Sequence, residues 1–336
     1  MDNPVGPLNL ITDVPGLAVG NAGDPELVSG VTVVLPDYPA IAAVDVRGGG
    51  TGSRDIELLK PSASIETVDA VVLSGGSAFG LDAAGGVMSW LAARGRGFPV
   101  GRARVPIVPQ AILFDLAGPS VALQGEHSPY RKLAREAAGS AGTRFRIGSV
   151  GAGTGARAGH LAGGLGSASV VIGELGVTVG AIVAANPVGD VLMPGTGVFW
   201  AWDMEREGEF GGRRPDGRHD PAAVSVPKAA SAGAHTTIGA VATDAALDRV
   251  QATRFAAIAQ AGLARAVRPA HTPLDGDMIL ALSTGRVPLA SPARDLAILG
   301  GHAANCVARA IARGVHAARG RRGAPAYTDL HAEGGA

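Results

Sequence analysis

The residues of this sequence best suited to chemistry are two adjacent threonines, Thr236 and Thr237, which follow a long polar segment and precede an apolar run. The run from Ile238 to Thr243 has small or apolar residues at both sets of alternate positions, which is typical of a strand covered on both faces. A hydroxyl at the rigid start of a strand can act as a nucleophile if a base lies within hydrogen-bond reach. A threonine pair before an apolar run is equally explained by β-propensity alone, so the pattern leaves both interpretations open.

A cut in the backbone before Thr236 would place a base beside its hydroxyl. Unperturbed α-amines have a pKa of about 7.7–8.0, so the new terminus would have a useful neutral fraction near pH 7. The amine would belong to the same residue as the hydroxyl, and no second side chain would have to supply the base. The sequence therefore allows an N-terminal threonine nucleophile, provided that the chain is cleaved at this point.

The composition predicts a protein with a large core. The 336 residues are 46% hydrophobic, include 51 glycines and carry 29 basic and 29 acidic side chains. The glycines lie among Val, Ile and Ala runs without a collagen period, which favours closely packed sheets over disorder. No basic stripe with interleaved aromatic residues occurs, which argues against a nucleic-acid partner.

The sequence has no feature of a secreted or membrane protein. No apolar run reaches the roughly 18 residues that a membrane helix needs, and residues 1–20 lack the basic and apolar regions of a signal peptide. The single cysteine, Cys306, excludes an intrachain disulfide, fits a reducing compartment and is expected to be an inert buried thiol in a helix. We therefore expect a cytoplasmic protein without a membrane partner.

Strand and helix patterns alternate in blocks along the chain, which predicts a layered α/β fold. Short apolar runs bounded by Gly, Pro and Asp predict strands at residues 31–35, 41–46, 70–73, 167–172 and 177–184. Helices are predicted at residues 131–140, after Asp244 as N-cap, and after Ser291, which is followed by Pro292. The predicted apolar faces are Leu247, Val250, Phe255 and Ile258 in the second helix, and Leu296, Leu299, Ala303, Val307, Ile311 and Val315 in the third.

Three glycine-rich segments are candidates for turns or ligand contacts. The first, residues 47–54, lacks the spacing and the lysine of a phosphate-binding loop and is expected to line a cleft or turn a corner. The second, Gly75-Gly76-Ser77, does not match the dinucleotide-binding fingerprint. With Ser77 as N-cap, the helix that follows it is suited to bind an anion or a substrate carbonyl. The third, residues 148–166, lies between strand patterns and is expected to be an ordered loop near a site.

The amino-acid composition changes at residues 203–234, which are predicted to be a surface linker that ends at the threonine pair. Their first part is charged and contains Gly and Pro, and their second part is small and poor in large apolar residues. Such a composition is typical of exposed connections between packed elements.

Several stretches, in one order along the chain, resemble the L-aminopeptidase/D-esterase family, which includes the β-aminopeptidases and the nylon-oligomer endohydrolase. The resemblance runs from about Asp13 to Asp329, nearly the whole chain. The matching stretches include Arg47-Gly48-Gly49, Gly75-Gly76-Ser77-Ala78-Phe79-Gly80-Leu81, Gly163-Gly164-Leu165-Gly166-Ser167-Ala168-Ser169, Asn186-Pro187-Val188-Gly189, Thr236-Thr237-Ile238 and Asp275-Gly276-Asp277. Several stretches in the correct order are far more specific than any one of them, and they favour a functional Thr236.

The resemblance implies a four-layered α-β-β-α sandwich similar to the N-terminal-nucleophile hydrolases, and an inactive precursor that cleaves itself between His235 and Thr236. Residues 1–235 and 236–336 would then be associated subunits of a single self-processing domain. The family nucleophile is Ser in the β-aminopeptidases and Thr in the nylon-oligomer branch, which this chain resembles. The resemblance further implies hydrolysis of small peptides, amides or linear oligoamides, no cofactor, and a homotetramer.

The same resemblance assigns roles to four residues. Thr236 attacks an amide carbonyl, the Asn186 side chain donates a hydrogen bond to the oxyanion, and Asp275 and Asp277 orient the α-amine and hold Thr236. Loss of one oxyanion donor typically lowers the rate about 100- to 1,000-fold. Two carboxylates across a glycine also occur in plain turns and in calcium loops, but too few further oxygen ligands follow for an EF-hand, and no metal site is predicted.

One departure from the family concerns a lysine that is thought to assist the nucleophile. Its position, near the end of the third glycine-rich segment, falls on His160 or Ala162, and no lysine occurs between Lys132 and Lys228. His160 would serve as a neutral donor or acceptor but not as a constant cation at pH 7. A site role and a structural role for His160 are therefore both open.

Two further departures lie close to the predicted site. The Asn that precedes the nucleophile in the nylon-oligomer branch is His235 here, and because this residue leaves with the carbonyl fragment, self-cleavage is expected to survive. A tyrosine near the site in that branch falls on Phe114, so a phenol role is absent. Phe114 is a candidate substrate-binding residue together with Gly75, Gly76 and Ser77.

Two other functions fit parts of the pattern. Ornithine acetyltransferases are similar in fold and also cleave themselves before a threonine, but their motifs around that threonine are not visible here. Alternatively, the missing lysine leaves the chain as an unprocessed scaffold without activity. An uncleaved chain would favour the scaffold, whereas turnover with an acyl donor and an acceptor amine would favour acyl transfer.

Overall fold

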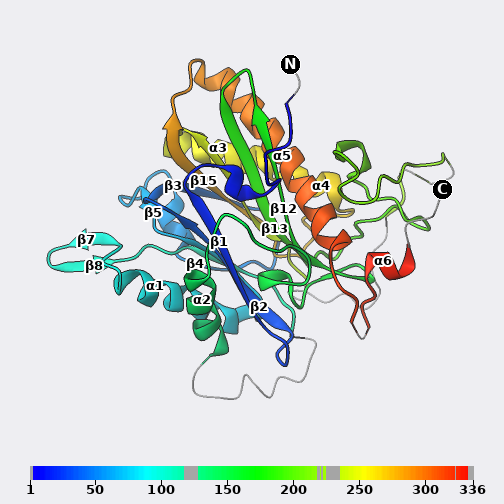
Figure 1. Ribbon diagram of the computed structural model, residues 1–336, viewed down its shortest axis with the longest axis horizontal. Coiled ribbons are helices and arrows are strands. Elements are labelled where there is room, and N and C mark those ends of the chain that lie inside the picture. Colours follow the sequence, from blue (N-terminus) through cyan, green and yellow to red (C-terminus); the bar gives the residue numbers. More distant parts are fainter. Residues whose placement is uncertain are drawn as a thin grey trace.

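Two β-sheets pack face to face, and each carries helices on its outer face (Figure 1). The computed structural model describes residues 3–116, 128–217, 220, 222–224, 235–321 and 323–331. The core between the sheets joins residues such as Val19 and Leu73 of one sheet to Leu165, Ile182 and Ile238 of the other. The order helix, sheet, sheet, helix confirms the predicted four-layered sandwich.

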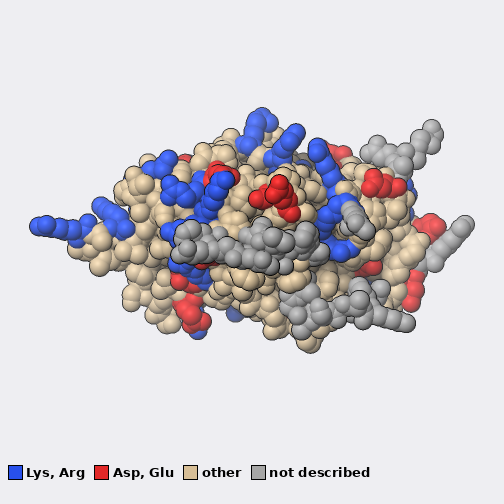
Figure 2. Space-filling view, turned by 90° about the horizontal axis from the view of Figure 1, so that it is seen from below, with Lys and Arg blue, Asp and Glu red and all other residues tan. Residues whose placement is uncertain are grey.

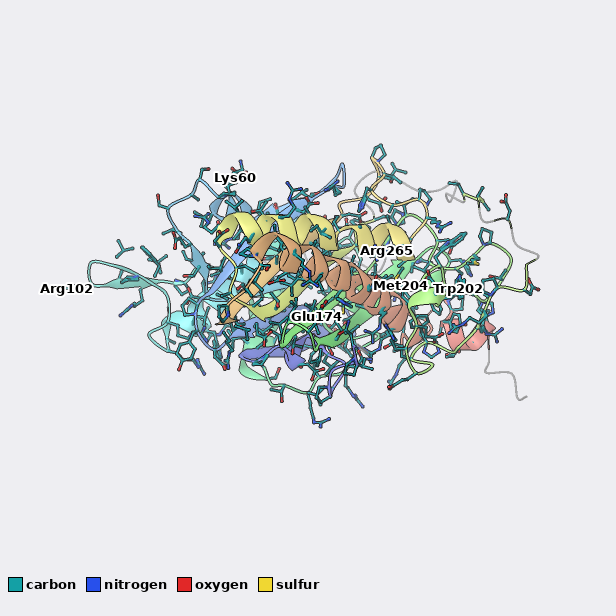
Figure 3. The ribbon with its side chains drawn as sticks, turned by 90° about the horizontal axis from the view of Figure 1, so that it is seen from above. Lys60, Arg102, Glu174, Trp202, Met204 and Arg265 are labelled. Carbon is teal, nitrogen blue, oxygen red and sulfur yellow. The ribbon has the colours of Figure 1, made fainter. Side chains whose placement is uncertain are left out.

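The first sheet has the strand order β1-β2-β6-β9-β4. Its strands are β1 (Leu17–Asp24), β2 (Ser29–Pro36), β6 (Val71–Ser74), β9 (Gln110–Ile112) and β4 (Gly52–Arg54). Helices α1 (Ala83–Ala92) and α2 (Pro129–Gly139) cover its outer face, where Val33 and Val72 pack with Val87 and Leu133. A hairpin of β7 (Phe98–Val100) and β8 (Ala103–Val105) projects from one end of the molecule, with Arg102 at its tip (Figure 3).

The second sheet has the strand order β12-β13-β14-β15-β3-β5. Its strands are β12 (Gly164–Ile172), β13 (Val177–Ala185), β14 (Ile238–Ala245), β15 (Met278–Val287), β3 (Ala40–Val46) and β5 (Thr67–Val68). Helices α3 (Arg249–Ala259), α4 (Ala261–Ala266) and α5 (Pro292–His316) cover it, and α6 (Tyr327–Leu330) follows near the C-terminus.

Helix α5 has the apolar stripe that the sequence predicts. Leu296, Leu299, Ala303, Val307, Ile311 and Val315 are all buried against the second sheet. Cys306 lies in the same helix, and burial raises the pKa of its thiol to about 11. The prediction that this thiol is buried in a helix is thus confirmed.

Strand β14 lies in the middle of the second sheet and is buried along its whole length. Ile238 is opposite Ala184 of antiparallel β13 and opposite Met278 of parallel β15. The strands that flank the β14–β15 pair precede position 236 in the chain, whereas β14 and β15 follow it. A break before Thr236 would therefore leave two fragments whose strands are interleaved in one sheet.

The helix predicted after Asp244 begins later than the sequence suggests. Asp244 lies in β14 and accepts a hydrogen bond from Thr178 N–H (2.7 Å), whereas Asp248 caps α3 by accepting Gln251 N–H (2.8 Å). Val250, predicted on the apolar face, is 66% exposed. The prediction of Asp244 as the cap was wrong because strand pairing with β15 continues past this residue, to Ala245 opposite Val287.

The described first part of the predicted surface linker, residues 203–217, is anchored to α5. Glu209 Oε1 accepts a hydrogen bond from Arg309 Nε (2.6 Å), and Oε2 accepts one from Arg309 Nη2 (2.9 Å) and one from Asn9 Nδ2 (2.6 Å). Arg313 Nε lies 3.3 Å from the same Oε2. Because both sides of the Glu209–Arg309 pair are buried, Glu209 fixes this segment to α5, although most of residues 203–217 are exposed. Most of the remaining linker, residues 225–234, lies outside the described residues.

Replacing Glu209 by Gln is expected to destabilise the protein by about 3–5 kcal/mol, because it leaves two buried arginine charges without their counter-charge. The free energy of unfolding is measured by urea denaturation. Glu207→Gln is the matched control, since Glu207 is exposed in the same segment. Equal urea midpoints for the two variants would contradict the anchoring role of Glu209.

The surface carries charges of both signs. Figure 2 shows Lys and Arg side chains interspersed with Asp and Glu over one face. In the part of the chain that the structure describes, no helix combines the length and the hydropathy needed to span a membrane. Figure 3 places Trp202 and Met204 in the half of the molecule away from the Arg102 hairpin.

Candidate active site

Thr236 lies two residues before the start of β14 at Ile238 and is only 3% exposed. Its backbone N–H donates a hydrogen bond to the carbonyl oxygen of Asn186 (2.7 Å). Its side-chain hydroxyl donates to the carbonyl oxygen of His235, the residue before it. Oγ1 therefore lies against the peptide group that the predicted cleavage would break.

A second hydrogen-bond donor meets the same carbonyl. Gly276 N–H donates to His235 O (3.1 Å), and His235 and Asp275 are paired as in a parallel ladder. A Cβ on Gly276 would lie 2.7 Å from Thr236 Oγ1 and 2.7 Å from the carbonyl oxygen of Gly50. Only glycine at position 276 therefore allows its N–H and the Thr236 hydroxyl to contact the His235 carbonyl oxygen together. A backbone N–H in that position stabilises negative charge on the oxygen.

Asp275 fixes the segment that contains Asn186 to the Asp-Gly-Asp turn. Its Oδ1 accepts a hydrogen bond from Val188 N–H (3.0 Å), and its Oδ2 accepts from the N–H (3.1 Å) and the hydroxyl (2.6 Å) of Thr272. Burial, followed by the nearby charge of Asp277, raises the pKa of Asp275, while the hydrogen bonds from Thr272 and Val188 oppose this. Asp275 therefore holds the backbone around the predicted nucleophile, Thr236.

Asp277 holds Thr237, the residue that follows the predicted nucleophile. Its Oδ1 accepts a hydrogen bond from Thr237 N–H (2.9 Å). Its Oδ2 accepts from His271 N–H (3.0 Å) and lies 2.9 Å from His271 Nδ1. The structure thus brings both predicted carboxylates to the backbone around Thr236, and each also contacts one side chain, Thr272 or His271. The partners His271 and Thr272 were not identified from the sequence, although only Pro273 and Leu274 separate them from the turn.

The first glycine-rich segment supports this turn. The Asp277 carbonyl oxygen accepts hydrogen bonds from Arg47 N–H (3.0 Å) and Gly48 N–H (3.2 Å), and the Asp275 carbonyl oxygen accepts one from Gly50 N–H (2.8 Å). A Cβ on Gly48 would lie 2.2 Å from Asp277 N. The glycines are needed because two backbone segments pack directly against each other here.

Asn186 is 2% exposed, and its side-chain amide is held from both ends. Oδ1 accepts a hydrogen bond from Arg157 N–H (2.9 Å), and Nδ2 donates to the carbonyl oxygen of Phe114 (3.1 Å). These two contacts fix which end of the amide is the donor. One Nδ2 hydrogen is left over, because a primary amide has two donors.

His160 and Ala162, the two positions that align with the family lysine, are not hydrogen-bonded to Thr236 within the described residues. His160 lies between β10 (Arg157–Ala158) and β11 (Leu161–Ala162), is 55% exposed at its side chain and faces Asp190 Oδ1 at 3.8 Å. Ala162 is buried in a small cluster with Ala318 and Ala324.

Arg157, which was not identified from the sequence, carries a positive charge near the predicted cleavage site. Burial lowers the pKa of His235, the Asp275 carboxylate opposes this shift, and the Arg157 guanidinium adds to it. The signal in the sequence is a lone arginine within the third glycine-rich segment.

The second glycine-rich segment adopts a different geometry from the one expected. Gly76 and Ser77 both have left-handed backbone conformations, with φ of 85° and 50°. Ser77 begins a 3₁₀ turn and its N–H donates to the carbonyl oxygen of Leu113 (2.9 Å). The prediction of Ser77 as an N-cap was wrong, because pairing with residues after β9 continues beyond the end of β6 and places Ser77 inside the turn.

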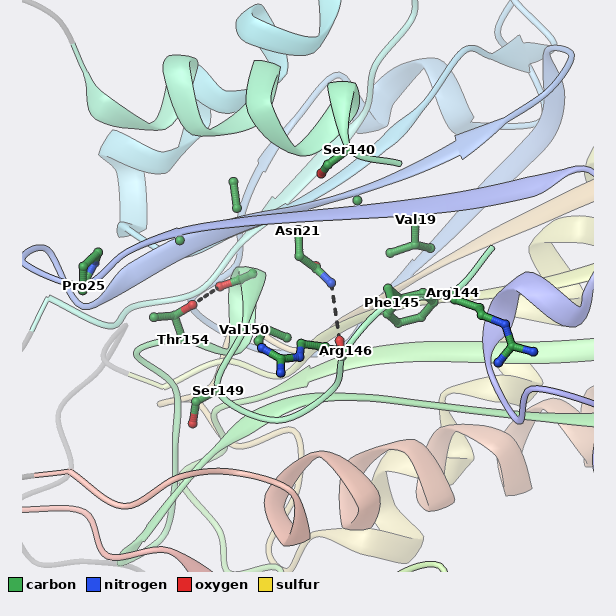
Figure 4. Close-up of a pocket in the computed structure, with 14 residues that line it drawn as sticks. Val19, Asn21, Pro25, Ser140, Arg144, Phe145, Arg146, Ser149, Val150 and Thr154 are labelled. Atoms are coloured by element: carbon green, nitrogen blue, oxygen red, sulfur yellow. Dashed lines mark hydrogen bonds between the residues drawn. The ribbon is translucent and has the colours of Figure 1, made fainter. Parts of the chain in front are cut away.

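A groove of about 420 Å³ lies along β1, at the edge of the first sheet (Figure 4). It is lined by residues of β1, by residues 144–146 and 149–151, and by Thr154, and none of the predicted site residues lines it. Asn21 Nδ2 approaches the carbonyl oxygen of Arg146 across it (3.5 Å). Within the described ranges no three His, Cys, Asp or Glu residues are grouped so that they could hold a metal ion.

Comparison with known proteins gives consistent matches over nearly the whole chain. A family model described as peptidase family S58 matches residues 9–328. An uncharacterized aminopeptidase of Mycobacterium tuberculosis is 42% identical over 345 residues, which cover 96% of this chain and 98% of that protein. A 6-aminohexanoate-oligomer endohydrolase of Agromyces sp. is 32% identical over 286 residues, which cover 82% of this chain and 75% of that protein.

A solved structure shows the same fold at lower identity. An L-aminopeptidase D-Ala-esterase/amidase from Ochrobactrum anthropi, described as a variant of the Ntn hydrolase fold, has a TM-score of 0.69 at 21% identity. The match covers 99% of this chain and 95% of that chain. The family match over residues 9–328 and the 42% identical relative establish that the chain belongs to peptidase family S58, a family of amide-bond hydrolases. The four-layered sandwich that it shares with the solved structure is consistent with this assignment.

Proposed function

We propose that this hydrolase cleaves itself between His235 and Thr236 and then uses Thr236 as an N-terminal nucleophile. Membership of the peptidase family supports an amide-bond hydrolase. The observation that carries the finer proposal is the pair of donors on one carbonyl: the Thr236 hydroxyl and the Gly276 N–H both hydrogen bond to His235 O.

The self-cleavage step begins with attack of Thr236 Oγ1 on the carbonyl carbon of His235. Gly276 N–H stabilises the negative charge that develops on the carbonyl oxygen. The C–N bond then breaks as the hydroxyl proton passes to the nitrogen, which gives an ester between the two residues and a free α-amine. Water hydrolyses the ester to a carboxylate on His235 and a free hydroxyl on Thr236.

In turnover, the freed α-amine takes the proton from Thr236 Oγ1 as this oxygen attacks the substrate carbonyl. The amine nitrogen already lies 2.7 Å from Asn186 O, an acceptor that it keeps after cleavage. Asp277 holds Thr237 and β14 lies inside the sheet, so the amine and hydroxyl stay in one geometry. The remaining Nδ2 hydrogen of Asn186 is proposed to bind the substrate oxyanion.

The proposed substrates are small peptides, amides and linear oligoamides. An aminopeptidase and an oligoamide endohydrolase both occur among the relatives, so both exo- and endo-cleavage are supported by likeness. The chemistry uses water and the groups of the chain itself and needs no cofactor. Assembly into a homotetramer remains a prediction from the family resemblance.

The role of Asn186 is tested by Asn186→Ala. We expect kcat to fall by about 100- to 1,000-fold, because one oxyanion donor is lost. Self-cleavage is expected to continue, because Gly276 holds the carbonyl that is cleaved in the precursor. Hydrolysis of a chromogenic amino-acid anilide gives kcat, and intact mass gives the extent of cleavage.

Asn305→Ala is the control, since Asn305 lies on α5 and its side chain accepts a hydrogen bond from Arg265 at the surface. It is expected to retain wild-type kcat. A wild-type kcat in Asn186→Ala would remove Asn186 from the oxyanion site, and the absence of both cleavage and turnover in the wild type would overturn the proposed function itself.

A further inference from the structure

Asp115 is a buried carboxylate that the proposed mechanism does not use. It is 5% exposed, and its Oδ1 accepts a hydrogen bond from Gly76 N–H (2.8 Å). Its Oδ2 has no well-formed hydrogen bond within the described residues. A Cβ on Gly75 would lie 2.2 Å from this Oδ2 and 2.3 Å from Ser29 Oγ, and a Cβ on Gly155 would lie 2.8 Å from it. Backbone from two glycine-rich segments therefore encloses the carboxylate.

The residue before Asp115 connects this carboxylate to the predicted oxyanion site. The carbonyl oxygen of Phe114 accepts the hydrogen bond from Asn186 Nδ2 (3.1 Å). The Asn186 amide is therefore attached to the chain at one residue's distance from the carboxylate that holds Gly76. Any shift of Asp115 relative to the Gly75–Ser77 turn moves the backbone to which Asn186 is bound.

We propose that Asp115 is a positioning residue for amide hydrolysis, because it ties the Gly75–Ser77 turn to the Phe114 carbonyl and so fixes the Asn186 amide at the reacting carbonyl. This inference rests on the proposed function. Asp115 acts through Asn186 and does not touch the reacting atoms.

The charged and titratable groups that face Asp115 are Arg321 and Tyr130. Arg321 donates hydrogen bonds to the carbonyl oxygens of Thr154 (3.3 Å) and Ala156 (2.7 Å) in the third glycine-rich segment. Tyr130 Oη donates to Ser29 Oγ (2.9 Å), and burial followed by the charge of Asp115 raises the pKa of Tyr130.

Burial raises the pKa of Asp115 to about 6, while the Gly76 hydrogen bond, Ser29 and Arg321 act in the opposite direction. Above pH 6 the ionised carboxylate makes a charge-assisted bond to Gly76 N–H, which is roughly twice as strong as a neutral one. Below pH 6 protonation weakens that bond, and the turn and Asn186 are held less firmly. The pKa of Asp115 in the folded state exceeds its ordinary value, so its protonation makes the folded state more stable as the pH falls from about 7 to about 4. A loss of activity over this range is therefore not caused by acid unfolding through Asp115.

The pH dependence of log(kcat/KM) separates this role from a purely structural one. In the wild type, the Thr236 α-amine gives a slope of about 1 below its pKa. Protonation of Asp115 is expected to lower kcat/KM by a further factor of about ten, so the slope rises above 1, to about 1.5, just below pH 6. In Asp115→Asn the slope is expected to stay at about 1 down to pH 5. At pH 8 the same variant is expected to lose about tenfold in kcat through misplacement of Asn186, with a smaller change in KM.

Asp69→Asn is the matched control. Asp69 is also buried, its Oδ2 accepts Ile107 N–H (2.9 Å), and its Oδ1 has no partner within the described residues. It lies before β6, at the opposite end of that strand from Gly75, so the control is expected to keep the wild-type slopes and kcat. All rates are expressed per cleaved chain, counted by intact mass.

Tyr130→Phe gives a second, independent readout that keeps the fold. It removes the donor to Ser29 but leaves the ring in its apolar cluster. Ser29 then stabilises the charged form of Asp115 less well. The pH below which the slope of log(kcat/KM) exceeds 1 is therefore expected to rise. The role of Asp115 would be overturned if Asp115→Asn kept the wild-type kcat and slopes and if the pH profile of Tyr130→Phe were unchanged. A cleaved and active wild type would still support the proposed function in that case.

Discussion

Replacing Thr236 by alanine is expected to leave a single chain of 336 residues and to reduce amide hydrolysis by at least about 10⁴-fold. The Thr236 hydroxyl is the group that contacts the His235 carbonyl, and no other hydroxyl is hydrogen-bonded to it within the described residues. Without Oγ1 there is no acyl transfer to free the α-amine, and without that amine there is no base for turnover. Both losses follow from one atom.

The experiment compares three variants by intact mass and by turnover of an amino-acid anilide. Thr236→Ser keeps the hydroxyl and is expected to be cleaved and active. Thr237→Val is the matched control, because Thr237 is the neighbouring threonine and its buried Oγ1 has no hydrogen-bond partner among the described residues. Thr236→Ala that is still cleaved before position 236, or a Thr237→Val variant that is as inactive as Thr236→Ala, would contradict the assignment of the nucleophile.

Gly276→Ala is expected to slow self-cleavage by about 100-fold or more. The added Cβ would meet Thr236 Oγ1 and the Gly50 carbonyl oxygen, each at 2.7 Å, and the turn would have to move away from the His235 carbonyl. The Gly276 N–H would then no longer stabilise charge on that oxygen, and loss of one such donor typically costs about 100- to 1,000-fold.

The fraction of full-length chain is followed against time after purification. Gly173→Ala serves as the control, since a Cβ on Gly173 meets nothing within 4 Å. We expect Gly173→Ala to be cleaved at the wild-type rate. Cleavage of Gly276→Ala at the same rate would show that the Gly276 amide takes no part in the reaction.

Local patterns were sufficient to predict the elements that form the core. The run after Thr237 became the fully buried β14, and the stripe from Leu296 to Val315 became the buried face of α5. These predictions succeeded because burial on two faces of a strand, or on one face of a helix, leaves a periodic record in the sequence. The order of the layers came from the family resemblance.

The connections around the site left no such record. Asp275 and Asp277 were identified as a pair, but their hydrogen bonds to Val188 and Thr237 depend on strands that meet only in the folded sheet. Asp115 lies after an apolar run whose pattern gives no sign of the glycine turn that it binds. Capping signals failed at Asp244 and Ser77 for the same reason, because pairing between distant segments decided the conformation of both.

The most direct test of the account is the intact mass of the purified wild-type protein under denaturing conditions, with sequencing of each N-terminus. We predict two species that correspond to residues 1–235 and 236–336, the second beginning with a free Thr236, and both eluting together under native conditions because their strands share one sheet. A single full-length species that stays uncleaved for days at neutral pH would contradict the proposal that this chain frees its own nucleophile.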